Sequence, residues 1–221
     1  YEAGYMPSEV SGLDRLYYDT TRPFERKVPY WPSYKETVTV SIPEAYILPQ
    51  GYTSVAERLR WNGVEMTLLE NDTTIEVTTY FIDNFKDRSG PYEGHYLHQD
   101  VKIRTERQYW KYFAGDWWIP TDQTAARYLV NTLEPEAPDS YFAWNFFDGI
   151  LMQKEYFSDY VYEDLAAKYL REDPGLREKL DMEKLTDPGF REDARAQLDF
   201  IYRNSPNFEK TYRRYPVARV Q

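Results

Sequence analysis

The hydrophobic pattern of this chain changes once, just past its midpoint, from an alternating period to a helical one. Before the change, apolar and polar residues alternate, as in 73–82, where Ile75 and Val77 would share one face of a strand. After it, apolar residues such as Leu129 and Leu133 recur at the spacing of one helix face. The sequence therefore predicts an α+β fold, in which an antiparallel or mixed β-sheet from the front half is packed with helices from the back half.

The front half is expected to contain several strands and one short helix. Ser54 and Glu57 have the spacing of a capping box, which predicts a helix start, and Asn62-Gly63 is typical of a helix end. Gly115-Asp116 is typical of a tight turn, so the segments on either side of it are expected to pair as a hairpin. Residues 83–100 are expected to form a polar loop. The expected strands are 37–42, 45–48, 64–69, 73–82, 101–113 and 117–119, with 45–48 and 64–69 flanking the helix in a β-α-β unit.

Two Asp-Pro pairs predict helix starts in the back half. In Asp173-Pro174 and Asp187-Pro188, the aspartate would be the N-cap and the proline would occupy the first helical position. The second pair would begin one helix that continues to Ile201. An earlier helix is expected over 158–171, with a buried stripe made of Val161, Leu165 and Tyr169.

These patterns divide the chain into a connector and a domain. Residues 1–36 carry prolines, glycines and aromatic residues without a sustained period, so they are expected to be an extended connector on the surface of a neighbouring domain. Residues 37–221 are expected to form an α+β accessory domain. It would be β-rich over 37–120 and mainly helical over 121–205, and would end in an extended tail, 206–221.

Charge and composition exclude several classes of function. The net charge of −10 and the scattered basic residues argue against binding to nucleic acid or to anionic membranes. There is no apolar run of about 18–20 residues, so no membrane span is expected. The sequence has no cysteine, which excludes disulfides, thiolate catalysis and zinc sites built on cysteine.

The two histidines of the chain, His95 and His98, are weak candidates for metal ligands. A catalytic zinc site needs three protein ligands and a nearby base, and neither His-x-x-Glu nor His-Glu-x-x-His is present. The alternative is an ordered loop in which both histidines form hydrogen bonds to the backbone. A set of acidic residues could instead supply paired carboxylates for glycoside hydrolysis, or form a helix exit and an N-cap. This set is Glu134, Glu136, Asp139 and Asp148.

Aromatic residues make up 18% of the chain, and 22 of them are tyrosines. Planar rings stack on the apolar faces of sugars, so Trp110, Trp117 and Trp118 are candidates for an exposed ligand-binding row on one sheet face. The alternative is that the rings belong to a core or a domain interface, where aromatic residues are also abundant.

Several stretches together resemble the region after the catalytic domain in large exported zinc carboxypeptidase-like proteins of Bacteroidetes-type bacteria. The resemblance spans almost the whole chain and depends on the number and order of the matches. It implies an upstream peptidase domain of the carboxypeptidase A type, which binds zinc through a His-x-x-Glu pair and a distant second histidine. These stretches are Gly4-Tyr5, Leu16 to Asp19, Ala45 to Gly51, Val55 to Leu59, Pro91 to Tyr96, Leu133 to Ser140 and Trp144 to Asp148.

The resemblance places no catalytic residue and no metal ligand on this sequence, because the zinc motif is missing here. We therefore expect a non-catalytic C-terminal accessory domain that packs on the peptidase domain of the same chain and shapes it. Zinc is expected in that upstream domain, and the protein is expected to be exported, periplasmic or extracellular. Two alternatives remain open: a carbohydrate- or peptide-binding module that uses exposed aromatic residues, and an independent metal-dependent hydrolase that uses His95 and His98.

Overall fold

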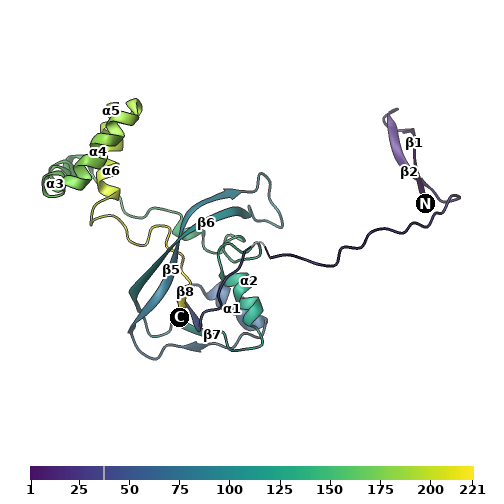
Figure 1. Cartoon of the computed structure of the whole chain (residues 1–221), viewed down its shortest axis with the longest axis horizontal. Coiled ribbons are helices and arrows are strands. Elements are labelled where there is room, and N and C mark those ends of the chain that lie inside the picture. The colour runs from purple at the N-terminus through teal and green to yellow at the C-terminus, as the bar shows by residue number, and fades with distance from the viewer. Residues whose placement is uncertain (37) are drawn as a thin grey trace. The chain divides into compact units, whose positions relative to one another are not determined.

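The computed structural model describes residues 1–36 and 38–221, which form two compact units. The N-terminal unit is Tyr1–Thr39, and the main unit is Val40–Gln221 (Figure 1). Of the strand expected at 37–42, Thr37 lies outside the described residues, and the described positions 38–42 are not a strand. None of the helices in the described part of the chain is long and apolar enough to cross a membrane.

The N-terminal unit contains a two-stranded antiparallel hairpin of β1 (Glu2–Pro7) and β2 (Asp14–Asp19). Its connection is closed by a hydrogen bond from the Ser8 N–H to the Leu13 carbonyl, 2.8 Å, and Gly12 takes a positive φ of 70° there. The interpretation of 1–36 as a plain extended connector misses this hairpin. Its strands contain a glycine, a proline and neighbouring tyrosines rather than a clean alternation, so they lack the usual strand signal.

The main unit is built on a six-stranded sheet with the order β4-β7-β3-β8-β5-β6, and every strand pair is antiparallel. Together with the helices described below, it confirms the predicted α+β class. The strands are β3 (Ala45–Leu48), β4 (Thr67–Leu68), β5 (Thr73–Asp87), β6 (His98–Tyr112), β7 (Trp117–Pro120) and β8 (Ala218–Val220).

The long hairpin of β5 and β6 dominates the sheet. Its register runs from Thr73 opposite Tyr112 to Asp87 opposite His98, with irregular pairing near Asn84. Both strands are therefore longer than expected, and the loop predicted over 83–100 is wrong at both ends. The ends are polar because much of the hairpin surface is exposed, and polar residues carry no apolar alternation from which a strand could be predicted.

Strand β7 does not return along β6, so the hairpin expected around Gly115-Asp116 is wrong. Strand β7 pairs instead with β3 and β4, and strands β3, β8 and β5 lie between it and β6 in the sheet. The buried carboxylate of Asp116 fixes this crossing, because it accepts the Phe113 N–H at 2.8 Å and the Gln50 N–H at 3.0 Å. These bonds tie the end of β6 to the segment after β3 and direct the chain away from β6.

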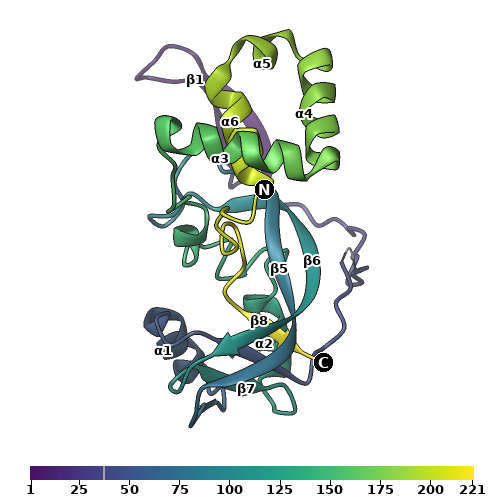
Figure 2. The same ribbon diagram turned by 90° about the vertical axis from the view of Figure 1, so that its left-hand side faces the viewer.

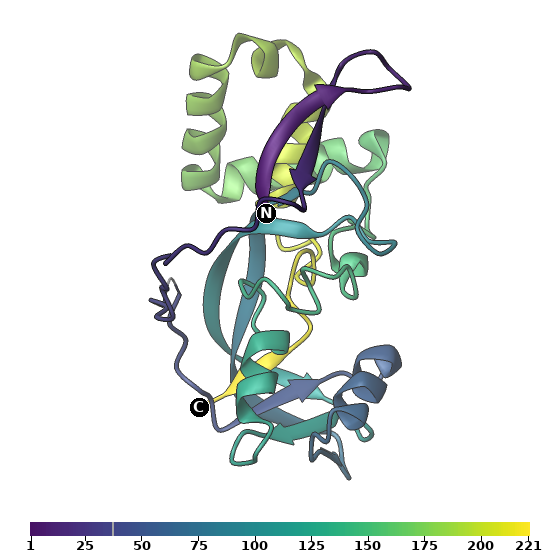
Figure 3. The same cartoon turned by 90° about the vertical axis from the view of Figure 1, so that its right-hand side faces the viewer.

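The C-terminal strand β8 lies inside the sheet, between β3 and β5 (Figure 3, yellow). Ala218 is fully buried, and the preceding Val217 belongs to the main core. The tail expected at 206–221 is therefore extended, but it is also a central structural element. Three strand residues with an arginine among them are too few to show a period, so the sequence pattern did not reveal this role.

Two helices cover one face of the sheet: α1 (Thr53–Trp61) and α2 (Ala126–Leu133). Strands β3 and β4 both run antiparallel to β7, so β3-α1-β4 is the expected β-α-β unit, although the strand expected at 64–69 is only Thr67–Leu68. Helix α1 ends as predicted at Asn62-Gly63, but its capping box is wrong, since Tyr52 is the N-cap and makes no side-chain cap bond. The core on this face includes Tyr46, Leu48, Leu59, Leu129, Phe142, Phe147 and Tyr215.

Four helices form a separate helical cluster with its own core (Figure 2). Asp173 and Asp187 cap the starts of α4 and α5 as predicted, and Asp193 caps α6, which breaks the single helix expected after residue 187 into two. Of the stripe expected on α3, Leu165 and Tyr169 pack against this core as predicted, but Val161 is exposed, and Tyr162 and Ala166 are the buried residues of the helix. The helices are α3 (Asp159–Glu172), α4 (Pro174–Thr186), α5 (Pro188–Glu192) and α6 (Ala194–Arg203).

Candidate functional site

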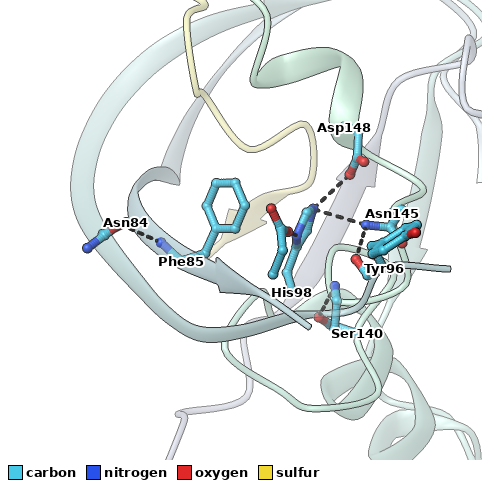
Figure 4. Close-up of polar contacts among 9 residues, drawn as sticks. Asn84, Phe85, Tyr96, His98, Ser140, Asn145 and Asp148 are labelled. Carbon is cyan, nitrogen blue, oxygen red and sulfur yellow. Dashed lines mark hydrogen bonds and ion pairs between the residues drawn. The ribbon is translucent and has the colours of Figure 1, made fainter. Parts of the chain in front are cut away.

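His98 opens strand β6 and is almost completely buried between the rings of Phe85 and Phe142, whose centroids lie 4.4 and 4.7 Å from its own. Its Nδ1 lies 2.7 Å from Asp87 Oδ1, and its Nε2 lies 2.9 Å from Asp148 Oδ1. Figure 4 shows Asp148 and Asn145 near this ring. The site joins the end of β5, the start of β6 and the one-turn 3₁₀ helix η1 (Asp148–Ile150).

The two carboxylates favour the doubly protonated form of the His98 ring. Each ring nitrogen faces a carboxylate oxygen, and both nitrogens donate hydrogen bonds in the imidazolium form. Burial of the ring works against the charged form, but the hydrogen bonds to Asp148 and Asp87 outweigh it and raise the pKa of His98. The two acidic partners thus favour the charged ring, and their contacts to both ring nitrogens suit a structural clamp better than a general base.

His95 lies in a separate turn. Its backbone pairs reciprocally with that of Tyr92, and the intervening Glu93 and Gly94 have positive φ values of 47° and 83°. Its ring packs edge-on against Trp144, with a centroid distance of 5.5 Å. The two candidate metal ligands therefore have different partners. Gly94 supplies a turn as the loop interpretation expects, but the ring-to-backbone bonds expected there are replaced by carboxylate contacts at His98 and by packing on Trp144 at His95.

The surroundings of His98 do not have the shape of a metal site. Asp87 and Asp148 contact opposite nitrogens of one ring, so the ring fills the space in which an ion would have to bind. Among the residues that the structure describes, no group of three or more His, Cys, Asp or Glu is arranged to hold a metal ion.

The acidic residues singled out in the sequence also have different partners. Asp148 faces His98, whereas Glu134 is buried and accepts a hydrogen bond of 2.7 Å from the Tyr46 hydroxyl. Glu136 and Asp139 are exposed, and Glu136 lines a shallow cavity of about 400 Å³ beside the start of β6. Asp148 and Glu134 are thus each engaged by a different basic partner, His98 and Arg219, and neither is a free carboxylate of the kind that glycoside hydrolysis requires.

Glu134 belongs to a buried polar network that sequence reasoning missed. Its Oε1 lies 3.3 Å from Nε of Arg219, on the C-terminal strand, and Arg219 also donates to the Tyr80 hydroxyl at 2.6 Å. Burial, together with the negative charge of Glu134, raises the pKa values of Tyr46 and Tyr80, so both phenols remain protonated, Tyr46 as a donor to Glu134 and Tyr80 as an acceptor from Arg219. The network locks β8 to the end of α2, and its partners lie too far apart in sequence for any local motif to reveal them.

The three candidate tryptophans do not share one face. Trp117 packs against the main core and lies under Arg60, whose guanidinium carbon is 4.4 Å from the ring centroid. Trp118 and Trp110 pack instead with the cluster on the opposite side of the sheet. The reason is the pleat of a strand, which points successive side chains to opposite faces. The exposed row expected from these residues is therefore not formed.

Trp110 lines a groove on the sheet face that is not covered by α1 and α2. The groove has a volume of about 440 Å³ and lies between the β5–β6 hairpin and the segment 208–213. Side chains at alternate positions of β6 supply one wall, so the strand period itself brings them together. The hairpin contributes Phe81, Ile82, Asp83, Arg104, Glu106, Gln108 and Trp110, and the second segment contributes Phe208, Glu209, Lys210, Tyr212 and Arg213.

The charges in this groove compensate one another. Arg104 is paired with Glu106 and lies 3.8 Å from Asp83, and its guanidinium carbon is 4.3 Å from the Phe81 centroid. Arg213 donates to the Asp83 carbonyl oxygen at 2.7 Å, which ties the segment 208–213 to β5. The groove is thus a neutral, preformed surface that combines aromatic rings with planar polar groups.

Comparison with known proteins adds no family to these observations. No family model matches the chain, and neither the curated proteins nor the solved structures contain a match to it.

Proposed function

We propose that this chain is a non-catalytic accessory domain of a zinc metallocarboxypeptidase-like protein, and that it packs on the peptidase domain and shapes access to its cleft. In this proposal the zinc and the catalytic residues belong to the peptidase domain, which lies upstream in the same exported, periplasmic or extracellular protein. The proposal rests on the resemblance of the chain to the region that follows such domains, and on the surface of the N-terminal unit.

The observation that carries the proposal is the exposure of the N-terminal unit. None of its described residues is buried, although they include many large apolar and aromatic side chains. A single two-stranded hairpin has no second layer against which its rings could pack. The exposed side chains are Tyr1, Tyr5, Met6, Val10, Leu13, Leu16, Tyr17, Tyr18, Phe24, Val28, Tyr30, Trp31, Tyr34 and Val38.

Exposed apolar surface of this density is typical of an interaction site. Full burial of one large apolar side chain contributes about 1.5–3 kcal/mol, so a few of these rings would hold a partner domain firmly. The segment around Tyr30, Trp31 and Tyr34 carries prolines at positions 29 and 32, which stiffen it and lower the entropy lost on docking.

The polar clusters of the main unit support a non-catalytic role. Both ring nitrogens of His98 face carboxylates, and Glu134 is occupied by Arg219 and Tyr46. These contacts stabilise the fold and leave neither group positioned as a free general base.

The test is the activity of the parent protein on peptides that end in a free carboxylate. Three forms are compared: the intact protein, the protein without residues 1–221, and a variant with Tyr30, Trp31 and Tyr34 changed to Ser. A matched control changes Tyr160 and Leu185, exposed side chains of the helical cluster, to Ser. We expect deletion and the N-terminal variant to alter kcat/KM or substrate preference, and the control to leave both unchanged. Unchanged kinetics after deletion would overturn the proposal.

A further inference from the structure

We propose that the groove between the β5–β6 hairpin and the segment 208–213 binds a neutral saccharide. This inference goes beyond the proposed accessory role, because it assigns a ligand to a surface of the main unit that is separate from the exposed N-terminal unit. Its volume of about 440 Å³ lies within the range of small-molecule sites, roughly 300–1,000 Å³.

The arrangement of the walls suits a ligand with an apolar face and a polar edge. Trp110, Phe81 and Tyr212 supply rings, while Arg104, Glu106 and Gln108 supply planar donors and acceptors on the same face of the hairpin. Each sugar hydroxyl both donates and accepts hydrogen bonds, so it can use both kinds of group. The C–H faces of a sugar ring are apolar and match an aromatic surface.

Trp110 is held in place by a buried cation. The guanidinium carbon of Arg214 lies 3.8 Å from the centroid of the indole, and Arg214 itself is only 8% exposed. Arg214 therefore covers one face of the indole. A ligand in the groove would contact the part of this ring that stays exposed. A ring that is fixed before binding loses little entropy when the ligand arrives.

The charge balance selects a neutral ligand over an ionic one. The lining contains three cationic residues, Arg104, Lys210 and Arg213, and three acidic ones, Asp83, Glu106 and Glu209. Arg104 already pairs with acidic neighbours inside the wall. Glu209 accepts hydrogen bonds of 2.8 Å from the Lys154 N–H and 2.9 Å from the Thr211 hydroxyl. No strong field of one sign is left to attract a phosphate, a polyanion or a free carboxylate.

The position of the groove also disfavours an extended peptide. Peptides commonly bind by adding a strand to an exposed sheet edge, through main-chain hydrogen bonds. The groove is lined by side chains on a face of the hairpin, where β5 pairs with β6 and, at Phe81, with Arg214, whereas strand addition would need the outer edge of β6. A ligand on this face meets side chains and not the outer edge of β6, which favours a compact hydroxylated ligand.

The experiment measures binding of neutral oligosaccharides to the full 221-residue chain. The probes are cello-, xylo-, manno- and chito-oligosaccharides. Their binding is measured by tryptophan fluorescence and by isothermal titration calorimetry, at low and at high salt. We expect at least one series to bind, with an affinity that changes little with salt, because a neutral ligand brings no charge to screen. The Trp110→Ala variant should bind about tenfold more weakly, which corresponds to about 1.4 kcal/mol.

The matched control is Tyr109→Ala, since Tyr109 is the neighbouring residue on β6, is exposed and points to the opposite face. It should bind like the unchanged chain. Trp110→Ala also removes the contact with Arg214, so a second variant, Tyr212→Ser, removes a ring from the opposite wall of the groove. Circular dichroism checks that all variants are folded. Failure of every series to bind would overturn the inference, as would binding that survives both groove substitutions or that disappears at high salt.

Discussion

The N-terminal unit and the main unit use aromatic residues in opposite ways. In the main unit, rings such as Tyr46, Phe142 and Tyr215 are fully buried around the sheet. In the N-terminal unit, Tyr30, Trp31 and Tyr34 are almost completely exposed, although the residue types are similar. The difference shows that aromatic content alone does not identify a core. A ring is buried only where a second layer covers it, and the extended segment after β2, which carries these three residues, has no such layer within its own unit.

The largest expected effect tests whether the main unit depends on its buried contacts. Replacing Glu134 by Ala would leave Arg219 as an unpaired buried cation, which should cost about 3–5 kcal/mol of unfolding free energy. Urea unfolding of the variant measures this loss. The double variant Glu134→Leu with Arg219→Met removes both charges together and should recover much of the stability. Equal stability of Glu134→Ala and the unchanged chain would show that the network does not hold β8 in place.

A second effect concerns pH. The pKa of His98 is raised in the folded state, so protonated His98 stabilises the fold. This stabilisation is fully present below the unfolded pKa of about 6.5 and is lost as the pH rises through the folded pKa. The groups that face the ring are Asp87, Asp148 and Asn145, together with Phe85 and Phe142. We expect the unfolding free energy of the main unit to fall over this window.

The His98→Gln variant is the control for this pH dependence. Glutamine keeps hydrogen-bonding capacity but does not titrate, so the fall in stability with rising pH should be absent. Nuclear magnetic resonance titration of the unchanged chain should also show a folded pKa for His98 above the ordinary imidazole value of about 6.5. An ordinary or lowered value for His98 would contradict the clamp described here.

A smaller effect is expected at the helix starts. Asp173 accepts a hydrogen bond of 3.0 Å from the Leu176 N–H, so Asp173→Ala should destabilise the helical cluster by about 1 kcal/mol. Asp181 lies in the interior of the same helix and is exposed, so Asp181→Ala should change stability by less than about 0.5 kcal/mol. Thermal unfolding of the two variants measures the difference, and equal shifts would contradict the capping assignment.

The smallest effect on stability is expected in the N-terminal unit. The variant with Tyr30, Trp31 and Tyr34 changed to Ser should leave the unfolding of the main unit within about 0.5 kcal/mol of the unchanged chain, because these exposed rings stabilise no core. Urea unfolding monitored at the main unit measures this. A loss of several kcal/mol would show that these rings belong to a core shared by both units, contrary to the contrast between them.

The sequence predicted those elements whose signal is local. The α+β class, the β-α-β unit and the Asp-Pro caps follow from period and capping chemistry within short windows. The central position of β8 and the pairing of β7 with β3 depend on contacts between residues far apart in sequence. They are decided by tertiary packing, which no short window contains.

The same limit applies to the candidate sites. The sequence marks His98 as a candidate metal ligand, but its second partner, Asp148, lies fifty positions away and is a candidate for glycoside hydrolysis instead. The groove is formed by two strands and by a segment that follows α6, so no local sequence motif predicts it. The alternating pattern of β6 did place Arg104, Glu106, Gln108 and Trp110 on one face, and that was the available signal.

The most direct test of the central claim is the affinity between the peptidase domain of the parent protein and this chain. Calorimetry would compare the unchanged chain with the variant carrying Ser at positions 30, 31 and 34, and with the Tyr160→Ser, Leu185→Ser control. If the exposed rings are the docking surface, the peptidase domain binds the unchanged chain and the control equally, and binds the N-terminal variant at least about tenfold more weakly. No association with the unchanged chain, or equal affinity for all three, would contradict the account.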